Sequence, residues 1–315
     1  VIQRISVMHK DFWKDKKVLI TGAHGFVGKN LVQFMKELNC ELLTPTKQEL
    51  NLICQNNTSD YFTQHKPNVV IHLAGLVGGI SANCSKLGDF FYQNAMIGVN
   101  VLHYAYVNGV QKFVGLAAGC GYPDVKDPFK ESDFWKDLPD SNSYGYSMAK
   151  KNLIIQSWAY RDQYNFDSTM LIPANLYGPY DNFDLETSHV MPALIRKFIE
   201  ADDKVVVWGS GTASREFIYV EDVCKAIVDC CEIKNLKGPY NLGTGVETTI
   251  VKLIETISTI TSFEGSIEWD RSKPDGQQRR YYDMSKFKED IGDIPFISLV
   301  NGIQKTVDWY KNEHQ

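Results

Sequence analysis

The chain has 315 residues and a formal net charge of −5, because 38 Asp and Glu outnumber 33 Lys and Arg. Hydrophobic residues make up 43% and charged residues 23%, which is typical of a globular protein and argues against a disordered one. The acidic balance favours no nucleic-acid partner. No apolar run approaches 18 residues, so we expect no membrane-spanning helix.

The cysteines are odd in number and form no C-x-x-C pair, which predicts reduced thiols rather than disulfides or a metal site. They are Cys40, Cys54, Cys84, Cys120, Cys224, Cys230 and Cys231. The first 15 residues lack the apolar core of a signal peptide. We therefore expect a cytoplasmic protein without a metal ion.

Short apolar segments alternate with helix-length segments in the first half of the chain. Strands are predicted at 17–22, 41–44, 69–74, 112–118 and 168–174, and helices at 26–38, 90–107 and 144–160. Such alternation is typical of βαβ units and predicts an α/β fold with a doubly wound parallel sheet.

The pattern loosens after residue 175. A polar irregular stretch at 179–188 precedes a predicted helix at 189–201 and a strand at 204–208. A helix at 221–232 is expected to return to the first domain. We therefore predict a Rossmann domain over 15–178 and about 215–237, and a smaller α/β substrate-binding lobe over 179–214 and 238–315.

A glycine motif lies between the first strand and the first helix. Gly22, Gly25 and Gly28 would allow a tight turn, close approach of a pyrophosphate and close helix–strand packing, respectively. The helix N-terminus would add free N–H groups. We expect a dinucleotide to contact Gly22, His24, Gly25, Phe26, Val27, Gly28, Leu73 and Ala74.

The end of the second strand bears on the choice between NAD and NADP. NAD-binding proteins usually carry a carboxylate there for the ribose hydroxyls. This chain has Thr44, Pro45, Thr46 and Lys47 instead, and a lysine would attract a 2′-phosphate. The segment therefore favours NADP over NAD. The preference is only modest, because the segment contains no arginine.

Tyr146 and Lys150 lie four residues apart on a predicted helix, so both side chains share one face. An isolated pair of this kind is usually a solvated helix surface. Downstream of a glycine motif it predicts proton transfer, because a neighbouring ammonium and a cationic nicotinamide favour the phenolate of Tyr146.

With these motifs in place, the chain resembles the extended short-chain dehydrogenase/reductases. It is most similar to the GDP-L-fucose synthase family, whose members epimerise GDP-4-keto-6-deoxy-mannose at C3 and C5 and reduce it at C4. The resemblance extends from Lys17 to about Tyr310. It rests on KQELNL at 47–52, VGGISAN at 77–83, CGYP at 120–123, NLYGPYDNF at 175–183, SHVMPALIRKF at 188–198, WGSGTASREFIYVEDV at 208–223, NLGTG at 241–245 and KPDG at 273–276.

The resemblance implies roles for particular residues. Tyr146 and Lys150 match the reductase pair, and Cys120 and His189 match the base and acid of epimerisation. It also implies a GDP-sugar substrate and a homodimer formed by a four-helix bundle of 90–107 and 144–160. The residues expected to contact the substrate are Val77, Gly78, Asn175, Arg196, Lys197, Trp208, Arg215 and Lys273.

One departure concerns the position two residues before Cys120, where the family has a serine that binds the C4 oxygen. This chain has Ala118. An inactivating substitution, a natural variant with another donor and a shifted activity all remain open, and Ser141 or Ser143 is a possible compensating donor. Pro45 and Lys47 are a second departure, since the family commonly has arginines there.

Other functions remain open. The substrate could be another GDP-4-keto sugar, such as a heptose. A 4,6-dehydratase is disfavoured because Gly119 and Cys120 provide no acid/base carboxylates. A weakly active or non-catalytic sugar-nucleotide-binding protein is supported only by Ala118.

Overall fold

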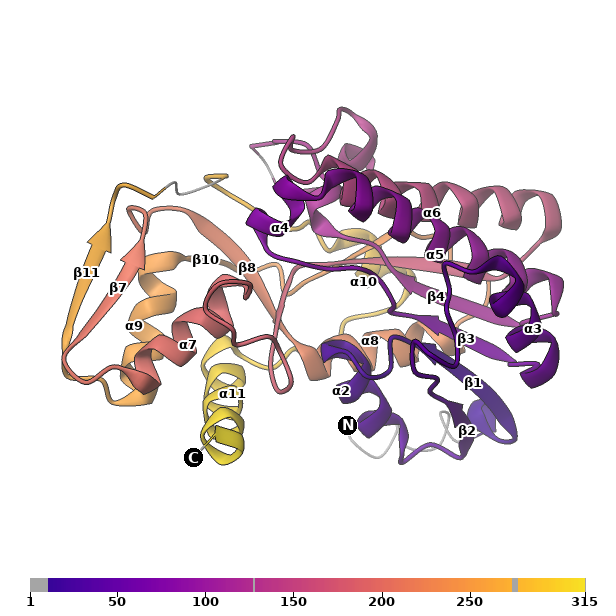
Figure 1. Ribbon diagram of the computed structural model, residues 1–315, viewed down its shortest axis with the longest axis horizontal. Coiled ribbons are helices and arrows are strands. Elements are labelled where there is room, and N and C mark those ends of the chain that lie inside the picture. The colour runs from indigo at the N-terminus through magenta and orange to yellow at the C-terminus, as the bar shows by residue number, and fades with distance from the viewer. Residues whose placement is uncertain (1–10, 127, 274–276, 315) are drawn as a thin grey trace.

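The computed structural model describes residues 11–126, 128–273 and 277–314. A parallel six-stranded sheet forms its larger part, in the order β2-β1-β3-β4-β5-β9 (Figure 1). The bounds of its strands are β1 Lys16–Thr21, β2 Cys40–Leu43, β3 Val69–His72, β4 Lys112–Leu116, β5 Ser168–Pro173 and β9 Tyr240–Leu242. The predicted doubly wound α/β fold is confirmed.

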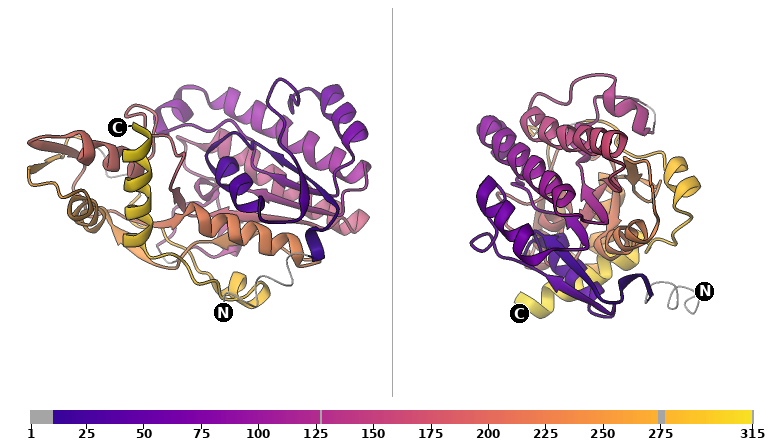
Figure 2. Two further views of the ribbon diagram at one scale, coloured as in Figure 1. Left: turned by 90° about the horizontal axis from the view of Figure 1, so that it is seen from below. Right: turned by 90° about the vertical axis from the view of Figure 1, so that its right-hand side faces the viewer.

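Helices cover both faces of this sheet (Figures 1 and 2). One face carries α3 (Gln55–His65), α5 (Leu87–Val107) and α6 (Tyr144–Tyr164), and the other carries α2 (Phe26–Met35) and α8 (Val220–Glu232). Every residue of β3 and β4 is buried, as expected for strands covered on both sides. Helix α8 packs on α2, so it returns to the sheet domain as the sequence predicts.

A smaller part has its own hydrophobic core. It contains a β10-β8-β6 sheet, a β11-β7 ribbon and three helices. Their bounds are β6 Asn175–Tyr177, α7 Val190–Glu200, β7 Lys204–Trp208, β8 Ser214–Tyr219, β10 Glu247–Thr249, α9 Ile250–Thr261, β11 Ser266–Asp270 and α11 Leu299–His314. The strand predicted at 204–208 has the bounds of β7, whereas His189 precedes α7 as its N-cap.

The C-terminal region is divided differently from the prediction. The sequence places all of 238–315 in the smaller lobe, but β9 pairs with β5 in the large sheet. Helix α10 (Ser285–Asp290) contacts β9, and Phe287 and Ile294 belong to the larger core. The chain therefore returns to the large sheet once more than the hydrophobic pattern indicates.

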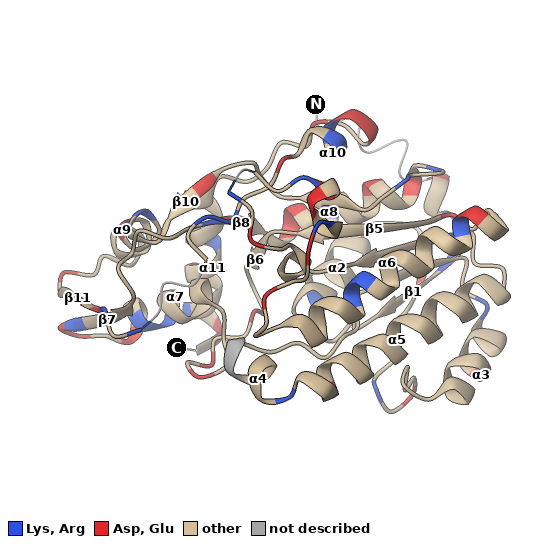
Figure 3. Ribbon diagram, turned by 90° about the horizontal axis from the view of Figure 1, so that it is seen from above, with Lys and Arg blue, Asp and Glu red and all other residues tan. Residues whose placement is uncertain are grey.

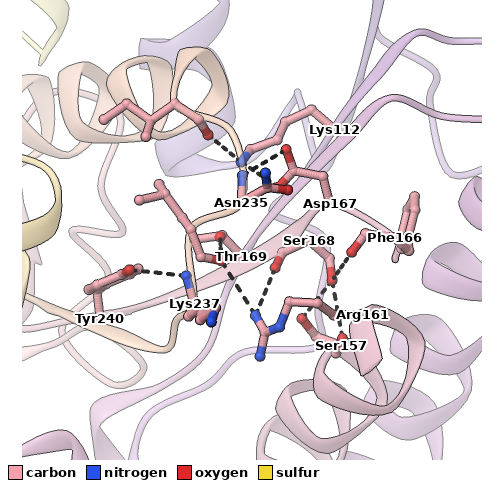
Figure 4. A network of polar contacts seen from close by, with 12 residues as sticks. Lys112, Ser157, Arg161, Phe166, Asp167, Ser168, Thr169, Asn235, Lys237 and Tyr240 are labelled. Carbon is pink, nitrogen blue, oxygen red and sulfur yellow. Dashed lines mark hydrogen bonds and ion pairs between the residues drawn. The ribbon is translucent and has the colours of Figure 1, made fainter. Parts of the chain in front are cut away.

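The amino end of β5 is held by polar contacts that join four segments (Figure 4). Lys112 forms an ion pair of 2.8 Å with Asp167 and donates to the carbonyl of Ile233. Ser168 is buried against Ser157 of α6. This network lies at the amino edge of the sheet, so the opposite, carboxyl edge is available for ligands.

Two further observations concern the surface. No helix in the described ranges is both long and apolar enough to span a membrane. Lys and Arg are interspersed with Asp and Glu on the face seen in Figure 3.

Candidate active site

The glycine turn after β1 has the geometry that a dinucleotide pyrophosphate requires. Gly22 has a φ of +74°, and a Cβ there would lie 2.8 Å from the nitrogen of Ala74. A Cβ on Gly28 would lie 2.1 Å from the carbonyl oxygen of Gly22. Both positions therefore require glycine.

Gly25 is the N-cap of α2 and has no side-chain cap. A Cβ built on it would meet only the carbonyl oxygen of Gly22 within 4 Å. The first N–H groups of α2 can therefore approach an anion closely. The turn also lies beside the point where the strand order reverses, between β1 and β3, which is where open α/β sheets bind ligands. These residues fit the predicted cofactor.

The loop after β3 continues the site. A Cβ on Gly75 would lie 2.9 Å from Asn94 Oδ1 and 3.4 Å from Lys150 Nζ. Asn94 holds this loop from α5, since it accepts from the Leu76 N–H at 2.9 Å and donates to the Leu76 carbonyl at 3.0 Å. Val77, further along, is 59% exposed. The loop at 73–78 therefore lies against both the glycine turn and α6.

Tyr146 and Lys150 lie together on α6, as their spacing predicts. Lys150 Nζ is 5.8 Å from the centre of the Tyr146 ring and donates to the Leu116 carbonyl at 3.2 Å. Burial lowers the pKa of Lys150 to about 8, an effect that a thiolate at Cys120 would partly reverse.

The pKa of Tyr146 is raised, first by burial and then by the charge of Cys120. The loss of hydration favours the neutral phenol, whereas the expected phenolate also depends on a bound cationic nicotinamide and stays a prediction. A phenol that keeps its proton can donate it to an oxygen anion. The direction of the shift therefore suits ketone reduction.

Cys120 lies in a short 3₁₀ turn, Gly119–Gly121 (η1), directly after β4. It is half-buried. A Cβ on Gly119 would overlap the Tyr282 hydroxyl, and a Cβ on Gly121 would overlap the Phe134 ring. Aromatic side chains therefore pack closely against both glycines of the turn, and they restrict its position.

Ala118 is extended and 8% exposed just before this turn. The proposed substitutes for its missing hydroxyl lie elsewhere. Ser141 is exposed, and Ser143 Oγ lies 3.4 Å from Ser147 Oγ. Neither observation supports a donor at the Ala118 position.

His189 comes from the other part of the molecule. It is the exposed N-cap of α7. The preceding segment approaches the loop after β3, because a Cβ on Gly79 would lie 3.2 Å from the Thr187 carbonyl oxygen. The structure thus brings the segment of His189 next to the loop that contains Gly78.

Three of the predicted substrate residues form a cluster at the end of β7. Trp208 is 61% exposed, with Lys197 Nζ 5.8 Å and Lys273 Nζ 5.2 Å from its ring. Lys197 also donates to the Val206 carbonyl. An open indole between two cations suits a nucleobase followed by phosphates.

The remaining predicted substrate residues have protein partners. Arg196 pairs with Glu200 at 2.9 Å and donates to the Phe183 carbonyl, so it joins α7 to the 179–188 stretch, and its contact with a diphosphate stays a prediction. Arg215 donates to the Gln277 carbonyl at 2.5 Å. Asn175 donates to the Glu216 carbonyl at 2.8 Å.

At the end of β2, His24 Nε2 lies 3.0 Å from the carbonyl oxygen of Thr44. Lys47 is exposed. A hollow of about 220 Å³ beside the glycine turn is lined by Ala23, His24, Lys29, Val32, Gln33, Lys36, Thr44 and Tyr180. Two lysines that the sequence did not single out therefore lie near the expected ribose.

Within the described ranges, no three His, Cys, Asp or Glu side chains gather as metal ligands.

Sequence reasoning missed Asn94, Ser147 and Tyr282. Asn94 is buried in α5, and its only signal is an amide on an otherwise apolar helix face. Ser147 Oγ is 3.1 Å from Cys120 Sγ. Tyr282 donates from its hydroxyl to the Pro173 carbonyl. The last two lie 27 and 162 positions from Cys120, so no local pattern could connect them to it.

The NAD dependent epimerase/dehydratase family model matches residues 18–243. GDP-L-fucose synthase 1 of Arabidopsis thaliana is 39% identical over 94% of both chains, and GDP-L-fucose synthase of Escherichia coli is 36% identical over 94% of this chain and 96% of its own. The chain belongs to the GDP-L-fucose synthase family. This agrees with the dinucleotide turn and the Tyr146–Lys150 pair.

Solved structures of this family and its neighbours have the same fold. A GDP-L-fucose synthetase from Naegleria fowleri superposes with a TM-score of 0.89 at 26% identity, over 96% of this chain and 95% of its own. A GDP-mannoheptose C4 reductase from Campylobacter jejuni with NADP bound has a TM-score of 0.86 at 30% identity, over 94% and 98%.

Proposed function

We propose that this protein is a nucleotide-sugar epimerase/reductase that acts on a substrate of the GDP-4-keto-6-deoxy-mannose type. One observation carries the proposal: α6 brings Tyr146, Lys150 and the turn of Cys120 to one place beside the dinucleotide cradle. One candidate base for a carbon acid, Cys120, and a proton donor for an alkoxide, Tyr146, therefore share one site.

Epimerisation needs groups on two faces of the sugar. The thiolate of Cys120 takes a proton from C3 or C5, and the electrons of that C–H bond pass into the 4-keto group to form an enolate. His189 then returns a proton to the opposite face of the carbon; desolvation lowers the pKa of this imidazole, which makes its protonated form a stronger acid. The two groups come from different parts of the molecule, and the proposal requires them to approach the sugar from opposite faces.

Reduction follows at C4. Bound at the glycine turn, the cofactor would supply the hydride. Tyr146 donates its proton to the C4 oxygen as the alkoxide forms, and Lys150 stabilises the phenolate that remains. Asn175 orients the sugar near C4, while Trp208, Lys197, Lys273 and Arg215 hold the nucleotide.

The experiment that tests this function follows both reactions in one sample. The protein is incubated in D₂O with GDP-4-keto-6-deoxy-mannose and NADPH, and deuterium at C3 and C5 is measured by NMR beside NADPH oxidation. We expect both signals, with exchange lost in Cys120→Ser and oxidation lost in Tyr146→Phe. If the wild-type protein neither exchanges deuterium nor oxidises NADPH with any GDP-4-keto sugar, the proposal fails.

NADPH is the proposed reductant. Lys47 and the hollow with Lys29 and Lys36 put positive charge near the expected ribose, and residues 44–47 contain no carboxylate that would repel a 2′-phosphate. Calorimetry should give a lower Kd for NADPH than for NADH. The Lys47→Ala substitution should weaken the binding of NADPH by a few-fold, as expected for loss of an exposed charge pair, and leave the binding of NADH unchanged. Equal affinities for the two cofactors in the wild-type protein would contradict this.

A homodimer through α5 and α6 is also proposed. Exposed apolar side chains lie along both helices: Phe91, Tyr92, Val99, Val107, Tyr144, Ile155 and Tyr164. Gln156 Oε1 is buried there with no hydrogen-bond partner among the described residues. A second copy would cover the apolar surface and could supply that partner.

A second candidate substrate is a GDP-heptose. A GDP-6-OMe-4-keto-L-xylo-heptose reductase from C. jejuni is 30% identical over 95% of this chain and 99% of its own, with a TM-score of 0.87. Parallel incubation with a GDP-4-keto-heptose separates the two, since the better substrate has the higher kcat/KM. A non-catalytic role would leave binding of NADPH without turnover of either sugar.

A further inference from the structure

The hydroxyl of Ser147 makes an unusual contact for a serine in a helix. Its Oγ lies 3.0 Å from the carbonyl oxygen and 3.1 Å from the Sγ of Cys120. A serine inside a helix commonly bonds to the carbonyl four residues back in the same helix. Ser147 instead reaches across to the turn after β4.

Ser147 cannot touch the substrate, because its exposed fraction is 0%. It lies behind the thiol, one residue after Tyr146 on the same turn of α6. Any effect on the reaction must therefore pass through Cys120. The Ser143 hydroxyl, at the start of α6, lies 3.4 Å from the Ser147 hydroxyl.

A serine hydroxyl has one proton and two acceptor lone pairs, and it rotates to suit its partners. While Cys120 is a thiol, Ser147 can donate to the Cys120 carbonyl and accept from the S–H. Once Cys120 is a thiolate, the same hydroxyl can turn and donate to the sulfur, and a hydrogen bond to a charged acceptor is stronger than one to a neutral acceptor.

We propose that Ser147 is the positioning residue of the epimerisation thiol: it holds Cys120 Sγ in the site and stabilises its thiolate without touching the sugar. This inference rests on the proposed function for its catalytic meaning. The contact between Ser147 and Cys120 stands independently of the substrate.

Other titratable groups also face Cys120. Tyr146 and Lys150 come from α6 and Tyr282 from the segment after β11, and the pKa of each responds to the charge of this thiol. The test must therefore isolate the contribution of Ser147 with all three of these groups unchanged.

The first measurement needs no substrate. Peptide mapping follows iodoacetamide alkylation of Cys120 across pH in the wild-type protein and in Ser147→Ala, with the exposed Cys54 and Cys84 as internal references. Loss of one hydrogen bond to a charged group predicts about 10-fold slower alkylation near neutral pH and a half-maximum about one pH unit higher. Cys54 and Cys84 should react as before.

The second measurement is deuterium exchange at C3 and C5 beside NADPH oxidation. Ser147→Ala should slow exchange by about 10-fold, in line with the alkylation effect, and leave the Kd of NADPH unchanged, which also shows that the variant is folded. Ser143→Ala is the matched control and should have the smaller effect, because its hydroxyl lies one step further away.

An unchanged alkylation profile in folded Ser147→Ala would overturn the inference, as would an equal effect of Ser143→Ala. If the profile shifts while even the wild-type protein neither exchanges deuterium nor oxidises NADPH, the proposed function fails but the Ser147–Cys120 contact is supported. The two failures are therefore distinguishable.

Discussion

Ala118 is the residue whose chemistry departs most from the family. It lies between β4 and the turn of Cys120, where a hydroxyl would polarise the ketone. Ser147 does not replace it, because that side chain is buried behind Cys120. Ser141, Ser143 and Ser147 therefore offer no replacement for the missing donor, and we predict a slow reductase step.

Restoring the hydroxyl tests this. Ala118→Ser should raise the rate of NADPH oxidation by about 10²–10³, the reverse of removing one donor to a developing oxyanion. Deuterium exchange should change less, because Cys120 and His189 are untouched. Single-turnover oxidation of NADPH with a GDP-4-keto sugar measures the effect. An unchanged rate would mean that another group already binds the C4 oxygen.

Lys150 is a residue at which function and stability conflict. Its ammonium is 6% exposed, and burial lowers its pKa from 10.5 to about 8. In that interval the unfolded chain binds more protons than the folded one, so wild-type stability rises with pH between about 8 and 10.5. Below pH 8 the full cost of burying the charge is present.

Lys150→Met should therefore abolish reduction but stabilise the fold at pH 7, by up to about 3 kcal/mol from the pKa shift. The difference in the free energy of unfolding between the variant and the wild type should be smaller at pH 9.5, where the wild-type lysine is largely neutral in the folded state. Urea unfolding of both proteins at the two pH values measures it. A variant that is less stable than wild type at pH 7 would show that the Leu116 hydrogen bond outweighs desolvation.

At the scale of elements, α5 and α6 determine both the site and the proposed dimer surface. They pack closely where Gly98 lies opposite Leu153, since a Cβ on Gly98 would lie 3.4 Å from Leu153 Cδ1. The inner face of α6 presents Tyr146, Ser147 and Lys150. Its outer face and that of α5 carry the exposed apolar residues.

Charges on that outer face should separate the dimer. Tyr92→Glu combined with Ile155→Glu should halve the mass measured by light scattering, from twice 35.8 kDa to 35.8 kDa at micromolar concentration. Val246→Glu, at a site that is 61% exposed in the smaller part, is the matched control and should stay dimeric. A wild-type protein that is itself monomeric would refute the dimer.

At the scale of the whole molecule, the proposed function gives the two parts separate tasks. The large sheet contains the glycine turn proposed to bind the dinucleotide, and the smaller part presents Trp208, Lys197 and Lys273, which are proposed to bind the nucleotide. A segment between them crosses back over the turn of Cys120. There Tyr282 donates its N–H to buried Glu216 and its hydroxyl to the Pro173 carbonyl, and it packs on Gly119.

This division predicts independent binding of the two ligands. GDP should quench tryptophan fluorescence, and Trp208→Phe should abolish the quenching. Trp208→Ala should weaken GDP binding by about 10-fold, since base–aromatic stacking contributes about 1–3 kcal/mol relative to alanine. The Kd of NADPH should not change. Trp135→Phe, also partly exposed but in the larger part, serves as the control. Quenching that survives in Trp208→Phe would place the base elsewhere.

The sequence by itself determined the parallel sheet, the glycine turn and the Tyr146–Lys150 pair. Each depends on residues close together in the chain: apolar runs alternating with helices, glycines three apart in one turn, and side chains four apart on one helix face. The family motifs also brought Cys120 and His189 into consideration. Their roles remain predictions.

Only the tertiary structure decided which distant segments meet. It pairs β9 with β5 in the large sheet and Arg196 with Glu200 on α7. It also brings the Ser147 hydroxyl into contact with Cys120 and packs Tyr282 against Gly119. It also raised the pKa of Tyr146, because burial depends on everything packed around the ring. These outcomes follow from packing between segments far apart in the chain, for which hydrophobic periodicity and local spacing contain no signal.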